Sequence, residues 1–400
     1  MNLILTDKCT NTCPYCFAAQ EMAKNLKQNN MKRDIFDAFI NFVDVSKESI
    51  DINLIGGEPL IYDDLEYVLK SVHNSVYITS FSVLTGGVVS KDKFELLLPY
   101  KSKMKLMFNL NESHTYLNPG HHKIVVENIA YAIELGIATT IGYNIYHQNF
   151  NANEIIDYCN KFGVNILRFS VACPIYGQKS NMVVPSAEYK SLSDKVYNFL
   201  ETCYYNDIEA ILDCPIPLCF FSDEQLGKLS KMHPMVVSRM GQCTPPIDIN
   251  YDLSVFRCFA LSNESKVNLT DFETFKDIKK YFLDEVDSRL ISPTVYEECK
   301  NCSYRKKCNG GCLANNCGFI KSPTKTDRIV EALNIAQQGD IKEAITRVIS
   351  ERELSSPELL LASRLYESIS DSENSKLFAQ RVVNNMSAPE LVQRALELLK

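Results

Sequence analysis

Residues 2–16 read NLILTDKCTNTCPYC, a short apolar run followed at once by three cysteines within eight positions. The apolar residues at 2–6 predict a buried strand. The loop behind it carries Cys9, Cys13 and Cys16 in the spacing C-x3-C-x2-C. Three thiolates cannot close a four-coordinate metal site alone. They indicate either a structural zinc with its fourth ligand elsewhere, or a [4Fe–4S] cluster in which one iron has no protein ligand.

The first half of the chain repeats the order of strand followed by helix. Strands are predicted at 2–6, 50–55, 77–84, 104–110, 139–145 and 165–171, and helices at 31–46, 63–74, 91–99, 121–135, 153–162 and 186–206. This order is typical of parallel βα units in a doubly wound sheet or a barrel. Functional loops in such folds lie at the carboxyl ends of the strands. The cysteine loop and the GGEP turn at 56–59 each follow a strand, so both are expected to face the same mouth.

Charge and composition restrict the class of protein. The chain has 400 residues and a formal net charge of −7, without runs of Lys or Arg, which argues against nucleic acid or an anionic membrane surface as partner. Neither a membrane span nor a signal peptide is predicted, so a cytoplasmic location is expected. In a reducing compartment, the fifteen cysteines favour metal or redox chemistry over disulfides.

A second group of cysteines lies far along the chain. Its seven members are Cys243, Cys258, Cys299, Cys302, Cys308, Cys312 and Cys317, and the last five follow the spacing C-x2-C-x5-C-x3-C-x4-C. Seven ligands exceed one tetrahedral zinc, and no His lies among them, so two Fe–S clusters are the economical interpretation. The other five cysteines (Cys159, Cys173, Cys203, Cys214 and Cys219) are interpreted mainly as small buried hydrophobes, with Cys214 and Cys219 as candidate further ligands.

The C-x3-C-x2-C loop, with Tyr15 before its last cysteine, and the GGEP turn together resemble the signature of the radical S-adenosylmethionine (radical SAM) superfamily. The resemblance implies a partial (β/α)6 barrel. In such a barrel Cys9, Cys13 and Cys16 would bind three irons of a [4Fe–4S] cluster, and SAM would chelate the fourth iron.

The same resemblance implies further contacts with SAM. The turn formed by Gly56, Gly57, Glu58 and Pro59 would contact the methionine amino group. Tyr15 would lie near the adenine, and Asn109 would contact the ribose or the carboxylate, although a strand-end residue making a local turn bond is the alternative for Asn109. One electron, from a donor of the flavodoxin or ferredoxin type, would cleave SAM to a 5′-deoxyadenosyl radical that abstracts a hydrogen from the substrate.

The distal cysteines resemble the SPASM extension of radical SAM enzymes. The resemblance implies one auxiliary [4Fe–4S] cluster on Cys299, Cys302, Cys308 and Cys317, and a second, nearer one on Cys243, Cys258 and Cys312. For the fourth ligand of the nearer cluster, Cys219 is favoured over Cys214. The alternatives are an iron left open for a substrate thiolate, or two buried free thiols. Relatives usually have a Gly where this chain has Leu253, which leaves the local hairpin turn in question.

Three domains are predicted: a radical SAM partial barrel at 1–207, a SPASM domain at 208–325, and an all-α tail at 326–400. The SPASM segment has too few apolar residues for a large core of its own, so metal is expected to organise it. In the tail, the stretch from Ala336 to Ile345 resembles part of a tetratricopeptide helix pair, with Gly339 in the first helix and Ala344 in the second. A plain helical cap is the alternative.

SPASM relatives mostly modify peptides or proteins, so the resemblance implies a ribosomally made peptide or a protein as substrate, with a thioether crosslink, a carbon–carbon crosslink or a related oxidation as product. A sulfatase-maturing activity is disfavoured, because Phe259 stands where those enzymes carry an Asp base. Eight residues precede Cys9, so a leader-binding domain is not expected in front of it. Two rival classes remain: an enzyme acting on a small molecule or cofactor precursor, and a non-catalytic Fe–S carrier or scaffold.

Overall fold

The computed structural model describes residues 1–16, 18, 29–176, 182–184, 189–290, 299, 302–304, 307–316, 332–333, 335–336, 339–349, 354, 356–384 and 389–399. The chain divides into two compact units, residues 1–320 and 321–400. Among the residues described, no helix combines the length and apolar character needed to cross a membrane. Cys317 lies outside the described residues.

A parallel sheet forms the centre of the first unit. Its seven adjacent strands follow the chain order: β1 (Asn2–Thr6), β2 (Ile50–Gly56), β3 (Ile78–Thr85), β4 (Met104–Asn109), β5 (Thr139–Ile145), β6 (Ile166–Val171) and β7 (Glu209–Leu212). The predicted α/β class and parallel sheet are confirmed, and all six predicted strands are present. The short strand β7 was not predicted.

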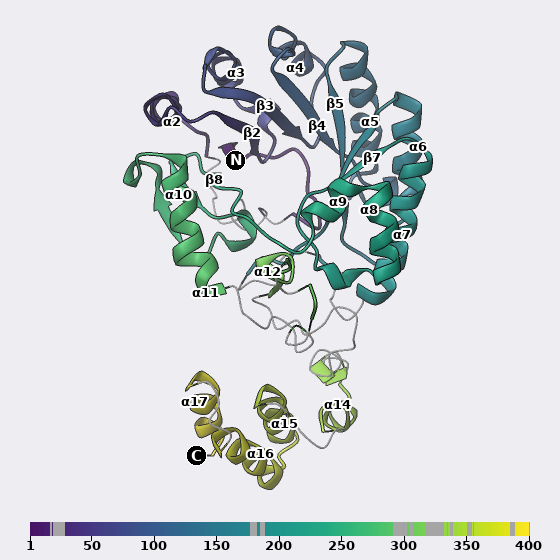
Figure 1. The fold of residues 1–400 in the computed structure, drawn as a ribbon, viewed down its shortest axis with the longest axis vertical. Coiled ribbons are helices and arrows are strands. Elements are labelled where there is room, and N and C mark those ends of the chain that lie inside the picture. The colour runs from purple at the N-terminus through teal and green to yellow at the C-terminus, as the bar shows by residue number, and fades with distance from the viewer. Residues whose placement is uncertain are drawn as a thin grey trace. The chain divides into compact units, whose positions relative to one another are not determined.

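Helices cover one face of this sheet. They are α2 (Arg33–Ser46), α3 (Leu65–Asn74), α4 (Asp92–Glu95), α5 (Pro119–Glu134), α6 (Asn153–Phe162) and α7 (Tyr189–Tyr205), with short 3-10 turns η1 (Pro59–Ile61), η2 (Leu98–Tyr100) and η3 (Ser113–Thr115). In Figure 1 these helices lie around the outside of the curved sheet. Strand β4 shows why: Met104, Leu106 and Phe108 are buried, whereas Met107 and Asn109 on the opposite face are half-buried. The inner face is therefore left for polar groups.

Three further strands extend the sheet beyond β1. Strand β8 (Asp248–Ile249) pairs parallel with β1, β9 (Ser254–Phe256) pairs antiparallel with β8, and β10 (Lys266–Asn268) pairs antiparallel with β9. The hairpin between β8 and β9 is formed, with the Leu253 amide donating to the Asn250 carbonyl at 3.0 Å. Leu253 adopts φ 63°, the left-handed conformation that a Gly would take without strain. The question left by the missing Gly is thus answered: Leu253 takes its place.

The segment after β7 packs on the same core as the barrel. It contains η5 (Leu218–Phe220), α8 (Asp223–Met232), α9 (Pro234–Arg239), η6 (Phe259–Leu261), η7 (Leu269–Asp271), α10 (Phe275–Tyr281), the π-helical η8 (Phe282–Asp287), α11 (Ser288–Leu290) and α12 (Leu313–Asn316). Buried side chains such as Leu229, Val236 and Ile278 join the main hydrophobic cluster. These residues therefore obtain their packing from the barrel, and a separate SPASM domain at 208–325 stays a prediction.

The second unit has a small hydrophobic core of its own. Its helices α14 (Ile341–Val348), α15 (Ser356–Ser368), α16 (Ser372–Asn384) and α17 (Pro389–Leu398) pack in succession. Side chains including Ala344, Leu359 and Phe378 are buried in this core. The tail is helical as predicted, and its likeness to a tetratricopeptide repeat stays a prediction.

The predicted position of Gly339 was wrong. Gly339 lies in the turn before α14 with φ 94°, and a Cβ there would meet nothing within 4 Å. The position needs a Gly because of the left-handed backbone, and not because another helix packs closely against it. Ala344 is fully buried in α14, the helix that follows this turn.

Candidate cluster and cofactor site

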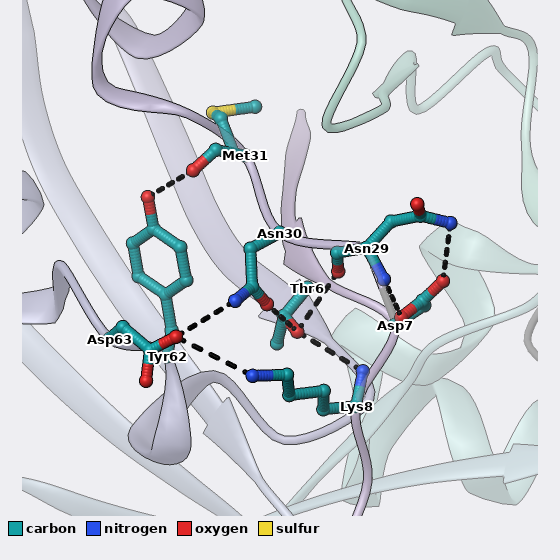
Figure 2. Close-up of polar contacts among 8 residues, drawn as sticks. All are labelled: Thr6, Asp7, Lys8, Asn29, Asn30, Met31, Tyr62 and Asp63. Atoms are coloured by element: carbon teal, nitrogen blue, oxygen red, sulfur yellow. Dashed lines mark hydrogen bonds and ion pairs between the residues drawn. The ribbon is translucent and has the colours of Figure 1, made fainter. Parts of the chain in front are cut away.

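The first residues of the cysteine loop are fastened to the segment that returns from it (Figure 2). The Asp7 carboxylate accepts hydrogen bonds from the backbone N and the side-chain Nδ2 of Asn29, at 2.6 and 2.9 Å. The Thr6 hydroxyl donates to Asn30 Oδ1 at 2.6 Å and accepts from the Lys8 amide at 3.1 Å. Since Thr6 ends β1, the point at which the loop leaves the sheet is fixed.

The GGEP turn lies directly against the start of the cysteine loop. The Gly57 amide donates to the Thr6 carbonyl at 2.8 Å, and the Glu58 amide donates to the Lys8 carbonyl at 2.7 Å. A Cβ on Gly56 would stand 2.3 Å from the Thr6 oxygen, and one on Gly57 would stand 2.0 Å from the Lys8 oxygen. The two glycines are therefore required by the close approach of the two backbones.

The carboxylate of the turn points into the protein. Glu58 is fully buried and accepts from the Leu60 amide at 3.1 Å, the Thr85 hydroxyl at 2.8 Å and the Gly86 amide at 2.8 Å. Burial raises the pKa of Glu58, and these three donors oppose the rise. Because β3 ends at Thr85, the side chain ties the turn to a third strand end. A cofactor contact from this turn would come from its backbone.

We predict that Gly57→Ala abolishes most activity while the protein still folds. The added methyl cannot fit 2.0 Å from the Lys8 carbonyl, so the cysteine loop and the turn must separate. Misplacement of a reacting group by about 1 Å costs about 100-fold in rate, and we expect at least that loss in SAM cleavage. The matched control is Gly227→Ala in α8, where nothing lies within 4 Å of the new methyl. A Gly57→Ala protein with parental SAM cleavage would contradict this role.

The three cysteines of the loop are neighbours and open to a ligand. Cys9 is exposed, and Cys13 and Cys16 are half-buried. Burial, together with the neighbouring thiol of Cys16, raises the pKa of Cys13 to about 12. Deprotonating all three in one place thus needs a compensating cation, and iron is one that thiolates favour. The buried hydroxyl of Thr10 has no hydrogen-bond partner among the described residues, so the loop retains unused polar capacity. The residues fit the cluster.

A single metal ion fits the described residues less well. No three His, Cys, Asp or Glu side chains in the part of the chain described here converge closely enough to hold one ion. In a [4Fe–4S] cluster each thiolate binds a separate iron, so the sulfurs need not converge on one point. The donor set of the loop is therefore compatible with a cluster in its present arrangement.

A chain of polar side chains runs from the loop across the inner face of the barrel. Tyr15 donates to Asn111 Oδ1 at 3.0 Å, and its hydroxyl accepts from Asn109 Nδ2 at 2.5 Å. Asn144 Nδ2 donates to Asn109 Oδ1 at 2.6 Å, and Ser170 donates to Asn144 Oδ1 at 2.7 Å. The chain joins β4, β5 and β6 to the cysteine loop. Asn109 therefore bonds across the sheet, and the alternative of a local turn bond is not what the structure shows.

A hollow beside the cysteine loop adjoins this polar chain. It is lined by Asn11, Thr12, Cys13, Pro14, Tyr15, Asn111, Thr115 and Tyr116. The Asn11 side chain also lies 3.3 Å from Nδ1 of His121. The hollow is small, about 10 Å³, which is room for about one water molecule, so its lining shows the polar and aromatic character of the site and not a cavity shaped for a cofactor.

The distal cysteines form two sets in the structure. Cys243, Cys258 and Cys312 lie together, and Cys173 and Cys214 pack in the same cluster; that the first three bind iron stays a prediction. The shared cluster buries Cys173 and Cys312 and leaves the other three sulfurs half-buried. We call these five residues the first thiol set.

Cys219 lies in the second thiol set, whose other described members are Cys299, Cys302 and Cys308. The predicted pairing of Cys219 with the first set therefore differs from the structure. The physical reason is local packing: a Cβ on Gly311 would stand 2.7 Å from the Pro217 nitrogen, so the loop after Cys308 presses on the segment that carries Cys219. That Cys219 binds iron at all stays a prediction.

Several residues of the site were missed in the sequence analysis. Thr85 and Gly86 hold Glu58, and Asn111, Asn144 and Ser170 extend the polar chain. A usable signal existed for Asn144 and Ser170, because both are polar residues near the ends of predicted strands. No local pattern marks Thr85 as the partner of Glu58, because the two residues come together only when β2 pairs with β3.

Comparisons with known proteins agree with this geometry. Residues 3–160 match the family model described as Radical SAM superfamily. Human molybdenum cofactor biosynthesis protein 1 is 30% identical over 210 residues, which cover 49% of this chain and 31% of that protein. A probable GTP 3′,8-cyclase of Methanococcus aeolicus is 22% identical over 311 residues, 73% of this chain and 95% of that protein.

Two solved structures share the fold. Native anSMEcpe with bound AdoMet aligns with a TM-score of 0.60 at 16% identity, over 86% of this chain and 98% of that one. SuiB of Streptococcus suis bound to the precursor peptide SuiA aligns with a TM-score of 0.56 at 17% identity, over 82% of this chain and 74% of that one. At these identities the likeness shows the fold.

A parallel βα partial barrel with three cysteines after its first strand and a glycine turn after its second defines the class of protein. Residues 3–160, which contain both motifs, are the part of the chain that matches the radical SAM superfamily. The match to the human relative spans about a third of that protein, so that protein's activity and substrate do not carry over to this chain.

Proposed function

We propose that this protein is a radical SAM enzyme with two auxiliary Fe–S clusters that modifies a side chain of a ribosomally made peptide or a protein. The observation that carries the proposal is the backbone contact between the GGEP turn and the cysteine loop, at 2.8 and 2.7 Å. Once bound at Cys9, Cys13 and Cys16, a [4Fe–4S] cluster would supply the electron that cleaves SAM to methionine and a 5′-deoxyadenosyl radical. A carrier without SAM chemistry would not need this contact.

The chain's own residues then hold and orient the cofactor. The backbone carbonyls of Gly56 and Gly57 would face the SAM amino group, and the turn is held by the Glu58 carboxylate, which accepts from Thr85 and Gly86 where β3 ends. Tyr15 and Asn109 place a hydroxyl and an amide at the inner face of the barrel, where they would hydrogen-bond the nucleoside. Because Asn144 and Ser170 anchor Asn109 from the next two strands, its orientation is set before the cofactor binds.

Two thiol sets support the auxiliary clusters. Each set gathers four or more described cysteines in the segment after β7 or at the strand ends next to it. Thiols that serve only as core side chains gain nothing over apolar residues by being grouped together, whereas an Fe–S cluster requires such a group. The segment also fits the SPASM spacing, whose relatives act on peptides.

The main alternative is an enzyme that acts on a small molecule. It is favoured by the relatives named GTP 3′,8-cyclase and molybdenum cofactor biosynthesis protein 1. The peptide proposal is favoured by the fold shared with SuiB, which was solved with a precursor peptide, and by the second thiol set. An electron donor of the flavodoxin or ferredoxin type and a cytoplasmic location belong to the same proposal.

The test is formation of 5′-deoxyadenosine by the anaerobically reconstituted protein, with three additions compared: buffer, GTP, and synthetic peptides from genes beside its own. We expect SAM cleavage in all three. Faster turnover, a mass change and transfer of substrate deuterium into 5′-deoxyadenosine should occur with one of the peptides alone. GTP-dependent turnover would establish the small-molecule alternative. A protein that carries iron and cleaves no SAM would be a carrier or scaffold.

A further inference from the structure

Two cysteines at the carboxyl ends of barrel strands reach the first thiol set. Cys173 lies two residues beyond the end of β6 and Cys214 two residues beyond the end of β7. The other three members, Cys243, Cys258 and Cys312, come from the segment that follows the barrel. The set therefore joins the mouth of the barrel to that segment.

The sulfur atoms form a connected series rather than isolated pairs. The Cys173 thiol donates to the Val171 carbonyl at 3.5 Å and lies beside both Cys312 and Cys214 in the same packed cluster. Cys312 in turn interacts with Cys243, and Cys243 with Cys258. Cys173 thus contacts one of the three predicted ligands, Cys312, and packs in the same cluster as the other two, as Cys214 does.

A buried cation faces two of these sulfurs. Arg257 is 1% exposed, and its Nη1 lies 3.3 Å from Cys243 Sγ and 3.8 Å from Cys258 Sγ. Its Nη2 donates to Asp287 Oδ2 at 2.9 Å, and its Nε also donates to that carboxylate. The carboxylate holds the guanidinium in place, Nη2 also donates to the Cys243 carbonyl at 3.3 Å, and Nη1 faces the two sulfurs. Donors of this kind stabilise thiolates and clusters that carry negative charge.

Simple burial does not account for this grouping. Cys159 and Cys203 are fully buried thiols on helices α6 and α7, and they serve as ordinary core residues. These two thiols neighbour only each other among the described cysteines, whereas Cys173, buried to a similar degree, lies in a group of five thiols that faces a guanidinium. A fully ligated [4Fe–4S] cluster needs four neighbouring cysteine sulfurs, and hydrogen-bond donors such as this guanidinium commonly stabilise it.

We propose that Cys173 is the fourth protein ligand of the auxiliary cluster held by Cys243, Cys258 and Cys312. The inference rests on the proposed function, because it requires that auxiliary cluster to exist. Cys214 is then a neighbouring thiol without an iron bond, and Cys219 belongs to the second thiol set. Binding at each position replaces a thiol proton with iron, so the site releases protons and leaves no iron open to substrate.

The ligand assignment also connects the auxiliary site to the SAM side of the barrel. Ser170, at one end of the polar chain that begins at Tyr15, is three residues before Cys173 on the same strand end. Strand β6 would therefore hold one end of the polar chain and one ligand of the auxiliary cluster. This places the proposed auxiliary cluster at the rim of the mouth that admits the substrate.

The test measures iron, sulfide and EPR spectra of the full-length protein with Cys9, Cys13 and Cys16 changed to Ala, so that auxiliary clusters alone contribute. Into this background we place Cys173→Ala, Cys214→Ala or Cys219→Ala. We expect about eight irons per chain in the background, and a fall to about four, with loss of one EPR signal, for Cys173→Ala. Cys214→Ala should keep the iron content and spectrum of the background. Cys219→Ala should change the other signal.

Each outcome decides between the two levels of the proposal. A background protein without iron overturns the auxiliary clusters themselves. A background with about eight irons and a Cys173→Ala spectrum identical to it overturns the assignment of Cys173 alone. Loss of the signal in Cys214→Ala instead assigns the ligand to Cys214 and also overturns our inference. If Cys173→Ala does not fold, Cys173→Ser keeps the side-chain size: a shifted EPR signal supports ligation, and an unshifted one overturns it.

Discussion

Changing Cys9, Cys13 and Cys16 together to Ala should abolish SAM cleavage and lower the iron content from about twelve to about eight per chain. The three thiols lie in one loop, and burial and the neighbouring Cys16 raise the pKa of Cys13 to about 12. Without bound iron these thiols remain protonated at neutral pH, so the fold of the protein should not depend on them. The rest of the fold should persist, since β1 and its pairing do not involve these side chains.

The control for this prediction is Cys159→Ala, which removes a buried thiol from the barrel core. It should cost about 1 kcal/mol of stability and no iron. Iron and acid-labile sulfide are measured beside 5′-deoxyadenosine, and unfolding is followed by circular dichroism. Zinc in place of iron in the parent protein would contradict the cluster. An iron content near four per chain in the parent would leave the loop cluster and exclude the two auxiliary ones.

Periodicity alone located the barrel strands to within one or two residues. Strands such as β4 and β5 alternate or run apolar over six or seven residues, and each is followed by an amphipathic helix. Strand β7 has four residues and β8 has two, which is too short for a period to be recognised. They are strands because neighbouring strands supply the pairing, which local sequence does not encode.

The cysteine spacings predicted which thiols lie near one another along the chain, and the fold decided which further thiols join them. Cys243, Cys258 and Cys312, which were predicted to share an auxiliary cluster, pack together in the structure. Cys173 looked like an isolated buried thiol because its neighbours in the set are 41 or more residues away in sequence, the nearest being Cys214. Its position directly after a predicted strand was a usable signal, since all parallel strands end at the same mouth.

The polar chain could be predicted in part. Asn109 was selected from its place at a strand end, but its partners Tyr15 and Asn144 come from a loop and a neighbouring strand. The register that brings Asn144 beside Asn109 follows from the pairing of β4 with β5, in which Asn109 is aligned with Gly142. A single sequence does not fix that register, so side chains aligned by it emerge only in the fold.

Deletion of residues 327–400 should leave about twelve irons per chain and uncoupled SAM cleavage intact, and should abolish peptide modification or raise the peptide KM at least tenfold. The tail forms a compact unit with its own buried core, in which Ala344 and Leu359 are fully buried. Because this core is built from tail residues alone, deleting the tail removes no side chain from the core of the barrel unit. Stacked helices offer an extended surface for a peptide, and exposed apolar side chains such as Leu377 on α16 provide contact area. The loss of remote binding energy should therefore appear in substrate turnover and not in cofactor chemistry.

The alternative is a tail that stabilises the cluster-bearing unit, and it predicts the opposite order: loss of solubility or of auxiliary iron before any specific effect on the peptide. Leu377→Ser in the full-length chain separates the two, because it keeps the tail core and alters its surface. A truncated protein that keeps its iron and modifies its peptide with the parental KM would exclude a recruiting role for the tail.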